Sequence, residues 1–428
     1  TPSNVAERMD TANEDRERVL IPTGYDGATC TCVRSLARQG VGTVVASEKP
    51  DVPAAASRYC DESVTLPPPR ADLLAYRDAL LALAEREDVR TIIPVRPEDT
   101  YLLSRYEASF AEHVSLVVPS MAKLERVFDR LQLAGAAEAA GVPVPETGRL
   151  FDVDDWTPEL LIKSRYNVLT DAFLDELEPA DVDVVKDIHH VGRGEAPDVT
   201  AIRSEMGHDP IVQEFVRTDG EFMFTGLYDH GEPLATFQHR QIRGNSYTGG
   251  GGVYRRSIAD PELERVGRAL LDELDWHGLA CIEYMRDATT GEYVLTEINP
   301  RMWQSLPSTV HAGADYPRYY WLAATGQTAA IDDSYDVGVG THMLYGEIGY
   351  LMSVLTEDSP HVDRPSIPGT LWEIGASIVR EPHFDYLTLD DPGPFVAGVR
   401  RALPDGVSDS LSRLPRRRYT DDHAPRHS

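Results

Sequence analysis

The sequence predicts a mixed α/β and α+β fold, with a Rossmann-like unit first and a strand-rich region after it. In residues 18–118, short apolar runs alternate with amphipathic helical patterns, which is typical of a doubly wound parallel sheet. In residues 210–330, alternating apolar and polar positions predict antiparallel strands. A length of 428 residues is enough for two or three modules, each with its own core.

The N-terminal unit opens with a strand at residues 18–22 and a glycine-containing turn at 23–27. A helix is predicted over 28–39, because apolar residues recur on one face and Gly40 follows. The next strand covers 41–46. The turn lacks G-x-G-x-x-G, so a dinucleotide oxidoreductase is only weakly indicated. The unit continues with helices at 73–86 and 98–110 and strands at 91–95 and 114–118.

The middle of the chain begins with a long helix predicted over residues 121–140, which Gly141 ends. A strand is predicted at residues 160–163, in which three apolar residues precede Lys163. Residues 171–209 are acidic and loop-rich, and they contain a glycine loop, His189–Gly194, whose backbone amides suit phosphate oxygens.

The strand-rich region predicts strands over residues 210–217, 221–228 and 233–243, then a glycine-rich loop at 244–252. A helix at 261–276 precedes a hairpin of strands 280–285 and 293–298. Closing helices are predicted at 306–312 and 316–325. The tail from residue 330 shows no repeat and no pattern that indicates chemistry.

The hairpin carries the strongest candidate for a functional site. Glu297 and Asn299 share one face of the second strand, and Glu283 lies on the neighbouring strand. Two carboxylates and an amide oxygen suit Mg²⁺ or Mn²⁺, and Arg301 just beyond suits a phosphate oxygen. The alternative is an ordinary hairpin with solvated acids.

The chain has a formal net charge of −29, with 70 acidic residues and 41 basic ones. Only four of the basic residues are lysines: Lys49, Lys123, Lys163 and Lys186. This composition favours adaptation to high intracellular salt, although an acidic protein from a GC-rich genome would also fit. The same charge argues against nucleic acid as a partner.

The expected compartment is the cytoplasm. Residues 1–17 are polar and acidic, and we expect a flexible segment there without a signal peptide. No apolar run approaches the roughly 18 residues of a membrane span. The four cysteines show no zinc spacing and are expected to be small buried or semi-buried thiols; a redox-active Cys30-x-Cys32 pair is the alternative.

The motif E-I-N-P-R, with an acid on the preceding strand, resembles the metal-binding end of the ATP-grasp superfamily, in particular its carboxylate–amine ligases. The resemblance implies a preATP-grasp domain at residues 18–118 and an ATP-grasp domain in two lobes, 119–209 and 210–330. Residues 331–428 would form a C-terminal extension. ATP and Mg²⁺ (or Mn²⁺) are the implied cofactors.

The resemblance also assigns roles to the charged residues of the hairpin and of the first lobe. It implies that Glu283, Glu297 and Asn299 hold the metal ion, and that Arg301 contacts a phosphate or acyl phosphate. Lys163 would contact the α- and β-phosphates. Lys123 would reach the nucleotide phosphates, although the family often has an acid before this lysine and this chain has Ala122.

Q-E-F-V followed by G-E resembles the adenine hinge of the family. Glu214 and the backbone of Val216 would meet the adenine edge, and Glu221 would bind the ribose hydroxyls. An arginine near the glycine-rich loop would neutralise the transferring phosphoryl group; Arg243 is the first choice and Arg240 the second. The first turn, Gly24, Tyr25 and Asp26, would help to hold the other substrate.

The implied function is an ATP-dependent carboxylate–amine ligase that works through an acyl phosphate and releases ADP and phosphate. Its partners would be small-molecule acids and amines, most commonly amino acids, and the chain is expected to form a homodimer. The alternative is a non-catalytic ATP-binding regulatory or assembly protein with the same fold.

Overall fold

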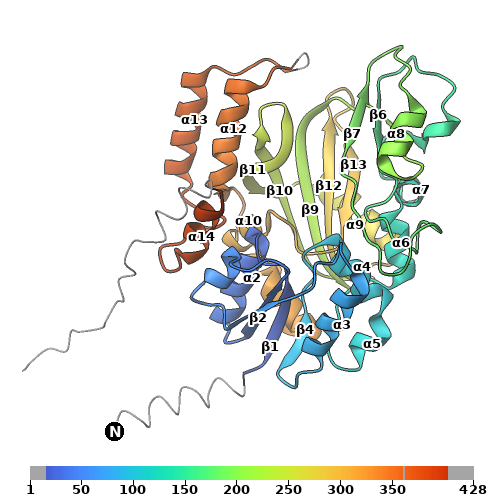
Figure 1. Cartoon of the computed structure of the whole chain (residues 1–428). Coiled ribbons are helices and arrows are strands. Elements are labelled where there is room, and N and C mark those ends of the chain that lie inside the picture. Colours follow the sequence, from blue (N-terminus) through green and yellow to red (C-terminus); the bar gives the residue numbers. More distant parts are fainter. Residues whose placement is uncertain (1–15, 360–361, 403–428) are drawn as a thin grey trace, which may run out of the picture.

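The computed structural model describes residues 16–359 and 362–402. Nearly all of the expected flexible segment at residues 1–17, and the basic triplet Arg416–Arg418, lie outside these residues. Figure 1 shows the N-terminal sheet below a large central sheet, with a small sheet on one side and a helical hairpin on the other.

The N-terminal unit is the predicted Rossmann-like arrangement, a parallel sheet in the order β3-β2-β1-β4. The six residues of β2 are all buried, as expected for an inner strand. The strands and helices of this unit are β1 (Arg18–Pro22), α2 (Gly27–Arg38), β2 (Gly42–Ser47), η1 (Pro53–Ala56), β3 (Glu62–Thr65), α3 (Leu73–Ala84), β4 (Val89–Ile92), α4 (Pro97–Arg105) and α5 (Glu107–Ala111).

Two predictions near the end of this unit were wrong. Residues 114–118 form no strand, because the segment makes only one backbone hydrogen bond toward β4, from Ser115 to Arg90. The long helix is divided into α6 (Met121–Phe128) and α7 (Arg130–Ala139). Asp129 separates them in an extended conformation, and its carboxylate caps α7 and pairs with Arg165 at 2.6 Å.

The small sheet is antiparallel, in the order β5-β8-β6-β7. Lys163 ends β6 as predicted, opposite Ile211 at the start of β8. The elements are β5 (Thr147–Arg149), η2 (Leu150–Asp152), β6 (Leu160–Lys163), β7 (Ile188–Val191), α8 (Val199–Met206) and β8 (Ile211–Glu214).

The central sheet has six strands in the order β13-β12-β9-β10-β11-β14. The predicted glycine-rich loop is instead the tip of the β10–β11 hairpin, since both strands run into it. The elements are β9 (Thr218–Asp229), β10 (Glu232–Ser246), β11 (Gly249–Ile258), α9 (Pro261–Glu273), β12 (Gly278–Asp287), β13 (Tyr293–Asn299), α10 (Leu306–His311), α11 (Tyr316–Ala324), η3 (Thr328–Ala330) and β14 (Gly340–His342).

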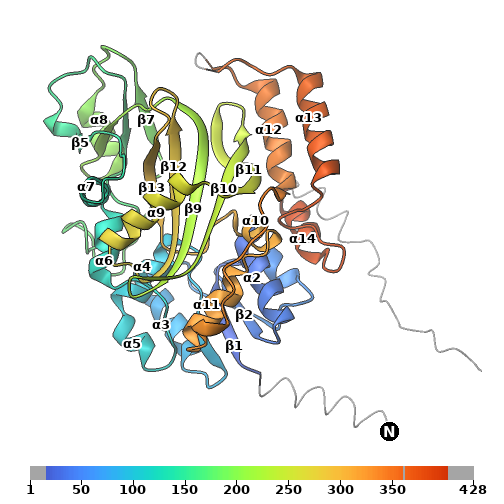
Figure 2. The same cartoon turned by 180° about the vertical axis from the view of Figure 1, so that it is seen from behind.

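The two faces of the central sheet have different surroundings. One face packs on α9, as Figure 2 shows. There the ring of Phe224 fills the space over Gly267 of the helix. The lower part of the other face packs on the N-terminal unit and on α10 and α11 around Trp303. Burying such large apolar side chains contributes about 1.5–3 kcal/mol each. The upper part of this face remains open to form a site.

The tail contains α12 (Leu344–Thr356), α13 (Ile367–Arg380) and α14 (Gly393–Ala402). Helices α12 and α13 pack as a hairpin beside β10 and β11, and α14 packs on η1 of the N-terminal unit. The connection from α13 to α14 therefore brings residues 393–402 against η1 of the N-terminal unit.

Candidate active site

The site is built around two carboxylates on neighbouring strands. Antiparallel pairing sets Glu283 of β12 directly opposite Glu297 of β13. The amide nitrogen of Asn299 donates to Oε1 of Glu297 at 2.7 Å and to Oε1 of Glu283 at 3.3 Å. The three predicted oxygen-bearing side chains therefore converge at one end of the hairpin.

The pKa values of this carboxylate pair are shifted in opposite directions, that of Glu283 upward and that of Glu297 downward. Burial, and then the charge of Glu297, raises the pKa of Glu283 to about 8. Burial also acts to raise the pKa of Glu297, but the charge of Arg130, the Asn299 hydrogen bond and the charges of Lys163 and Arg301 together lower it. The pair therefore favours a nearby cation.

The donor set fits a hard divalent ion. Carboxylate and amide oxygens are the ligands of Mg²⁺ and Mn²⁺. The amide oxygen of Asn299 faces Arg301, whose Nη2 donates to it at 3.1 Å. A half-turn of the amide group would direct this oxygen toward Glu283 and Glu297 instead.

Basic side chains approach the carboxylates from the small sheet and from α7. The half-buried Lys163 lies near both acids, and desolvation followed by the charge of Arg130 lowers its pKa to about 8. Arg130 donates from Nη2 to Oε2 of Glu297 at 3.2 Å and from Nη1 to the carbonyl of Ser164 at 3.0 Å.

Lys123 does not lie at this site, contrary to the prediction. Its Nζ pairs with Oδ2 of Asp275 at 2.8 Å, beside the end of α9. Arg130 reaches the carboxylates instead. The sequence signal was present, because Asp129–Arg130 provides the acid-then-base order that Ala122–Lys123 lacks.

A cavity of about 330 Å³ lies on the open face of the central sheet, beside the carboxylates. Glu221 lines it, accepts a hydrogen bond from Nε2 of Gln241, and has its pKa raised by burial. Glu214 is exposed at the end of β8, and Val216 lies half-buried in the hinge after it. The adenine and ribose contacts of these three residues stay predictions.

The two arginines predicted to meet the phosphoryl group point elsewhere. Arg243 is buried and pairs with Glu347 of α12, with Nη1 2.7 Å from Oε2. Arg240 lies over the ring of Phe222, on the face of the sheet that packs on α9. Both predictions are corrected, because neither arginine is among the described residues that line the cavity.

Arg255 of β11 lines this cavity together with Arg301, and no pattern in the sequence pointed to it. It lies on the same face as Glu283, because strand pairing sets it opposite Gln241. Its guanidinium, 1% exposed, pairs with Oδ2 of Asp385 at 2.9 Å. In the sequence, only strand alternation distinguishes Arg255 from Arg256. Arg256 faces the other side of the sheet and pairs with Glu381.

A second cavity, of about 870 Å³, adjoins the first, and Arg301 and Gln304 line both. Tyr25 and Asp26 line the second cavity, as the expectation of a substrate site there requires. Asp26 also caps α2 by accepting from the backbone of Thr29 at 2.7 Å. Gly24 shapes the turn, because a side chain at its φ of 140° would collide with Val52.

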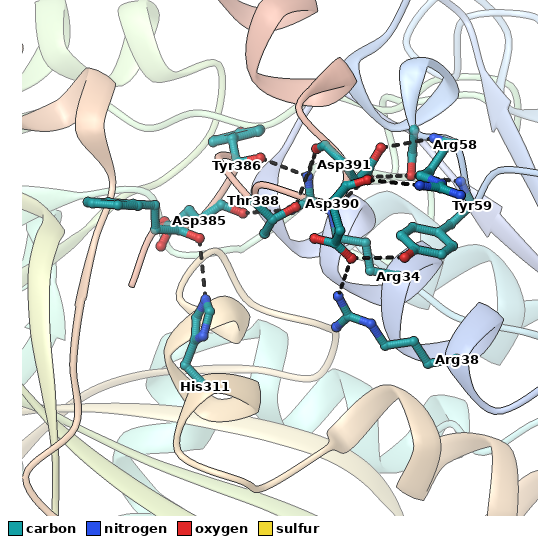
Figure 3. A network of polar contacts seen from close by, with 12 residues as sticks. Arg34, Arg38, Arg58, Tyr59, His311, Asp385, Tyr386, Thr388, Asp390 and Asp391 are labelled. Atoms are coloured by element: carbon teal, nitrogen blue, oxygen red, sulfur yellow. Dashed lines mark hydrogen bonds and ion pairs between the residues drawn. The ribbon is translucent and has the colours of Figure 1, made fainter. Parts of the chain in front are cut away.

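The segment between α13 and α14 supplies Tyr386 to the second cavity and Asp385 to Arg255 of the first, although the tail had indicated no chemistry. Figure 3 shows the polar network that fixes it to the N-terminal unit. Asp391 accepts from Nε of Arg34 at 2.9 Å and from the backbone of Arg58 at 2.9 Å. The network thereby positions Asp385 under Arg255 and Tyr386 at the wall of the second cavity.

The arrangement of the three sheets is shared with solved structures. The biotin carboxylase domain of Hydrogenobacter thermophilus 2-oxoglutarate carboxylase, in complex with MgADP, ADP and bicarbonate, superimposes with a TM-score of 0.57 at 14% identity, over 76% of this chain and 73% of that one. The ADP complex of PurK, an N5-carboxyaminoimidazole ribonucleotide synthetase, gives a TM-score of 0.56 at 15% identity, over 85% and 96%. The chain has the ATP-grasp fold.

Biotin carboxylase from Campylobacter jejuni has the same fold, with a TM-score of 0.55 at 12% identity, over 77% of this chain and 75% of that one. No protein-family description matches the sequence, and no curated protein resembles it. At these identities the likeness establishes the ATP-grasp fold alone. Within the residues described, no helix is both long and apolar enough to cross a membrane.

Proposed function

We propose that this protein is an ATP-dependent carboxylate–amine ligase that forms a C–N bond through an acyl phosphate. The observation that carries the proposal is the convergence of Glu283, Glu297 and Asn299, with the half-buried Lys163 close to the two acids. Solved proteins of this fold include complexes with ADP and MgADP. The fold and this cluster together support ATP as substrate and Mg²⁺ (or Mn²⁺) as its counter-ion.

We assign each group of the site a role in this reaction. Glu283, Glu297 and Asn299 would hold the metal ion, which supplies charge neutralisation between phosphate oxygens. Lys163 would bind the α- and β-phosphates as a point charge. Glu221 would accept hydrogen bonds from the ribose hydroxyls, and Glu214 and the Val216 backbone would meet the adenine edge.

In the first step an oxygen of the substrate carboxylate attacks the γ-phosphorus, the bond to the bridging oxygen breaks, and ADP leaves. In the second step the amine nitrogen attacks the acyl carbon, phosphate leaves, and the nitrogen releases a proton to solvent. Both steps join anions or concentrate negative charge. Arg255 and Arg301 line the cavity and would stabilise that charge. Arg255 thus takes the role expected of Arg243 and Arg240.

The test compares two glutamates of the same hairpin. Glu297→Gln should abolish ADP formation in a mixture of acids and amines, while far-ultraviolet circular dichroism stays unchanged. Glu292→Gln is the control, because Glu292 is exposed near the turn. Full ADP release by Glu297→Gln would refute the metal assignment. Tight ATP binding without ADP release in the unmodified chain would favour the non-catalytic alternative.

The chain is further proposed to form a homodimer through the helical hairpin. Helices α12 and α13, of 13 and 14 residues, carry only three charged residues in a chain that is 26% charged. Exposed apolar side chains, among them Ile348, Met352, Leu371 and Trp372, lie on these helices. Two chains of charge −29 repel one another, so a charge-poor face favours contact between two copies.

A further inference from the structure

Lysines gather at the cavities of this lysine-poor protein. Lys49 and Lys186 both line the cavity of about 870 Å³, and Lys163 approaches the metal-site carboxylates. Three of the four lysines in 428 residues thus face the proposed reaction path. A flexible point charge is therefore retained where it can meet a ligand.

The charges around the second cavity do not balance. Five basic and three acidic side chains line it. Two of the arginines are matched within the protein: Arg70 pairs with Glu98 at 3.2 Å, and Arg96 pairs with Glu48 at 3.2 Å. The surplus positive charge therefore belongs to the remaining basic residues, Lys49, Lys186 and Arg301.

Lys49 and Lys186 provide much of this surplus. Neither has an acidic partner within 4 Å among residues 16–359 and 362–402. The Lys49 ammonium instead lies 4.4 Å from the centre of the Tyr25 ring, and a cation–π contact leaves the charge available to an anion. In a chain with 70 acidic residues, two exposed lysines at one cavity that lack an acidic partner among the described residues indicate an external anion.

Arg301 connects this cavity to the metal site. It lines both cavities, and its Nη2 donates to Asn299. Its Nε is buried and lacks a hydrogen-bond partner among the described residues. A carboxylate that lies at Arg301 would face the nucleotide, and the rest of its molecule would extend toward Lys49 and Lys186.

We propose that the acid substrate carries a second anionic group, a carboxylate or a phosphate ester, which Lys49 and Lys186 bind. The inference rests on the proposed ligase function and names its substrate class. Lys49 follows β2 of the N-terminal unit, and Lys186 precedes β7 of the small sheet. The second anionic group would therefore bridge two sheets. A cavity of this volume holds ligands well beyond a simple amino acid, since sites of about 300–1,000 Å³ take drug-sized molecules.

The test measures binding by calorimetry without nucleotide, at one fixed KCl concentration in which the full chain is folded. The probes are glutarate and 3-phosphoglycerate, which carry two anionic groups, and butyrate, which carries one. We expect the better dianion to bind at least about tenfold more tightly than butyrate, or about 1.4 kcal/mol. The preferred dianion distinguishes a carboxylate from a phosphate ester.

Lys49→Ala and Lys186→Ala should each weaken dianion binding about tenfold, and Lys186→Arg should retain most of it. Lys123→Ala is the matched control, because Lys123 pairs with Asp275 away from the cavity. Equal binding of butyrate and the dianions, no binding of either dianion, or equal losses in Lys123→Ala would overturn the proposal. Dianion binding without any ADP release would refute the ligase function alone, whereas ADP release with monocarboxylates only would refute the substrate class alone.

Discussion

Removing the carboxylate of Asp385 should destabilise the protein. It should also lower ADP release, because Arg255 loses the ion pair that positions it. Both side chains of this ion pair are 1% exposed, and Nη1 of Arg255 contacts Oδ1 at 3.2 Å and Oδ2 at 2.9 Å. After Asp385→Ala, the guanidinium would keep, among the described residues, only its hydrogen bond to the carbonyl of Gly252. Leaving such a charge buried and unpaired costs about 3–5 kcal/mol.

The assay is urea unfolding followed by tryptophan fluorescence. At a slope of about 3 kcal/mol per M, the expected loss lowers the midpoint by about 1 M or more. Asp390→Ala is the control in the same segment, since Asp390 pairs with Arg38 and both side chains are about half exposed. An exposed pair contributes about 0–1 kcal/mol, so the control should shift the midpoint far less.

The double variant Arg255→Met, Asp385→Leu separates the structural role from the chemical one. An apolar pair of similar size should recover most of the stability, because a buried ion pair gains little over good packing. ADP release should nevertheless stay as low as in Asp385→Ala. Equal midpoint shifts for Asp385→Ala and Asp390→Ala, or full ADP release by the double variant, would refute the reasoning.

Four further outcomes are expected. Lys163→Met should weaken ATP binding at least about tenfold, measured by calorimetry, while Lys123→Met should not; equal losses would contradict the placement of Lys163. Raising KCl from 0.1 to 2 M should raise the urea midpoint, because the Debye length falls from about 10 Å to below 3 Å; full stability without salt would argue against salt adaptation. Burial raises the pKa of Cys60 to about 11, so its alkylation by iodoacetamide should quicken about tenfold per pH unit between pH 8 and 10, and rapid labelling of several thiols at pH 8 would contradict the burial. Trp372→Asp should convert dimers to monomers in light scattering while its neighbour Glu373→Gln does not, and an unchanged mass would place any contact between copies elsewhere.

The parts of the site that depend on local pairing were predictable from the sequence. Glu283 and Glu297 meet because a hairpin fixes which residues lie opposite one another. Lys163 was located by a short apolar run that ends in a base. The parallel sheet followed equally from alternating strand and helix patterns in residues 18–118.

The parts that depend on distant segments were not predictable. The prediction for Arg243 failed because Arg243 pairs with Glu347, which lies 104 residues later in the sequence. Arg255 is positioned by Asp385, 130 residues later, in a tail whose pattern indicated no chemistry. The place of Arg130 at the site depends on the break at Asp129, which pairs with Arg165, and no helical periodicity reveals this contact.

The second cavity is lined by Tyr25 of the N-terminal unit and by Tyr386 of the segment between α13 and α14. The hydroxyl of Tyr386 donates to the carbonyl of Tyr25, which lies 361 residues earlier in the sequence. During synthesis at about 5–20 residues per second, these two tyrosines leave the ribosome about 20–70 seconds apart. The Rossmann-like sheet can fold long before its second wall exists. A nascent or prematurely terminated chain would therefore be folded in part, with the second cavity still lacking the wall that Tyr386 supplies.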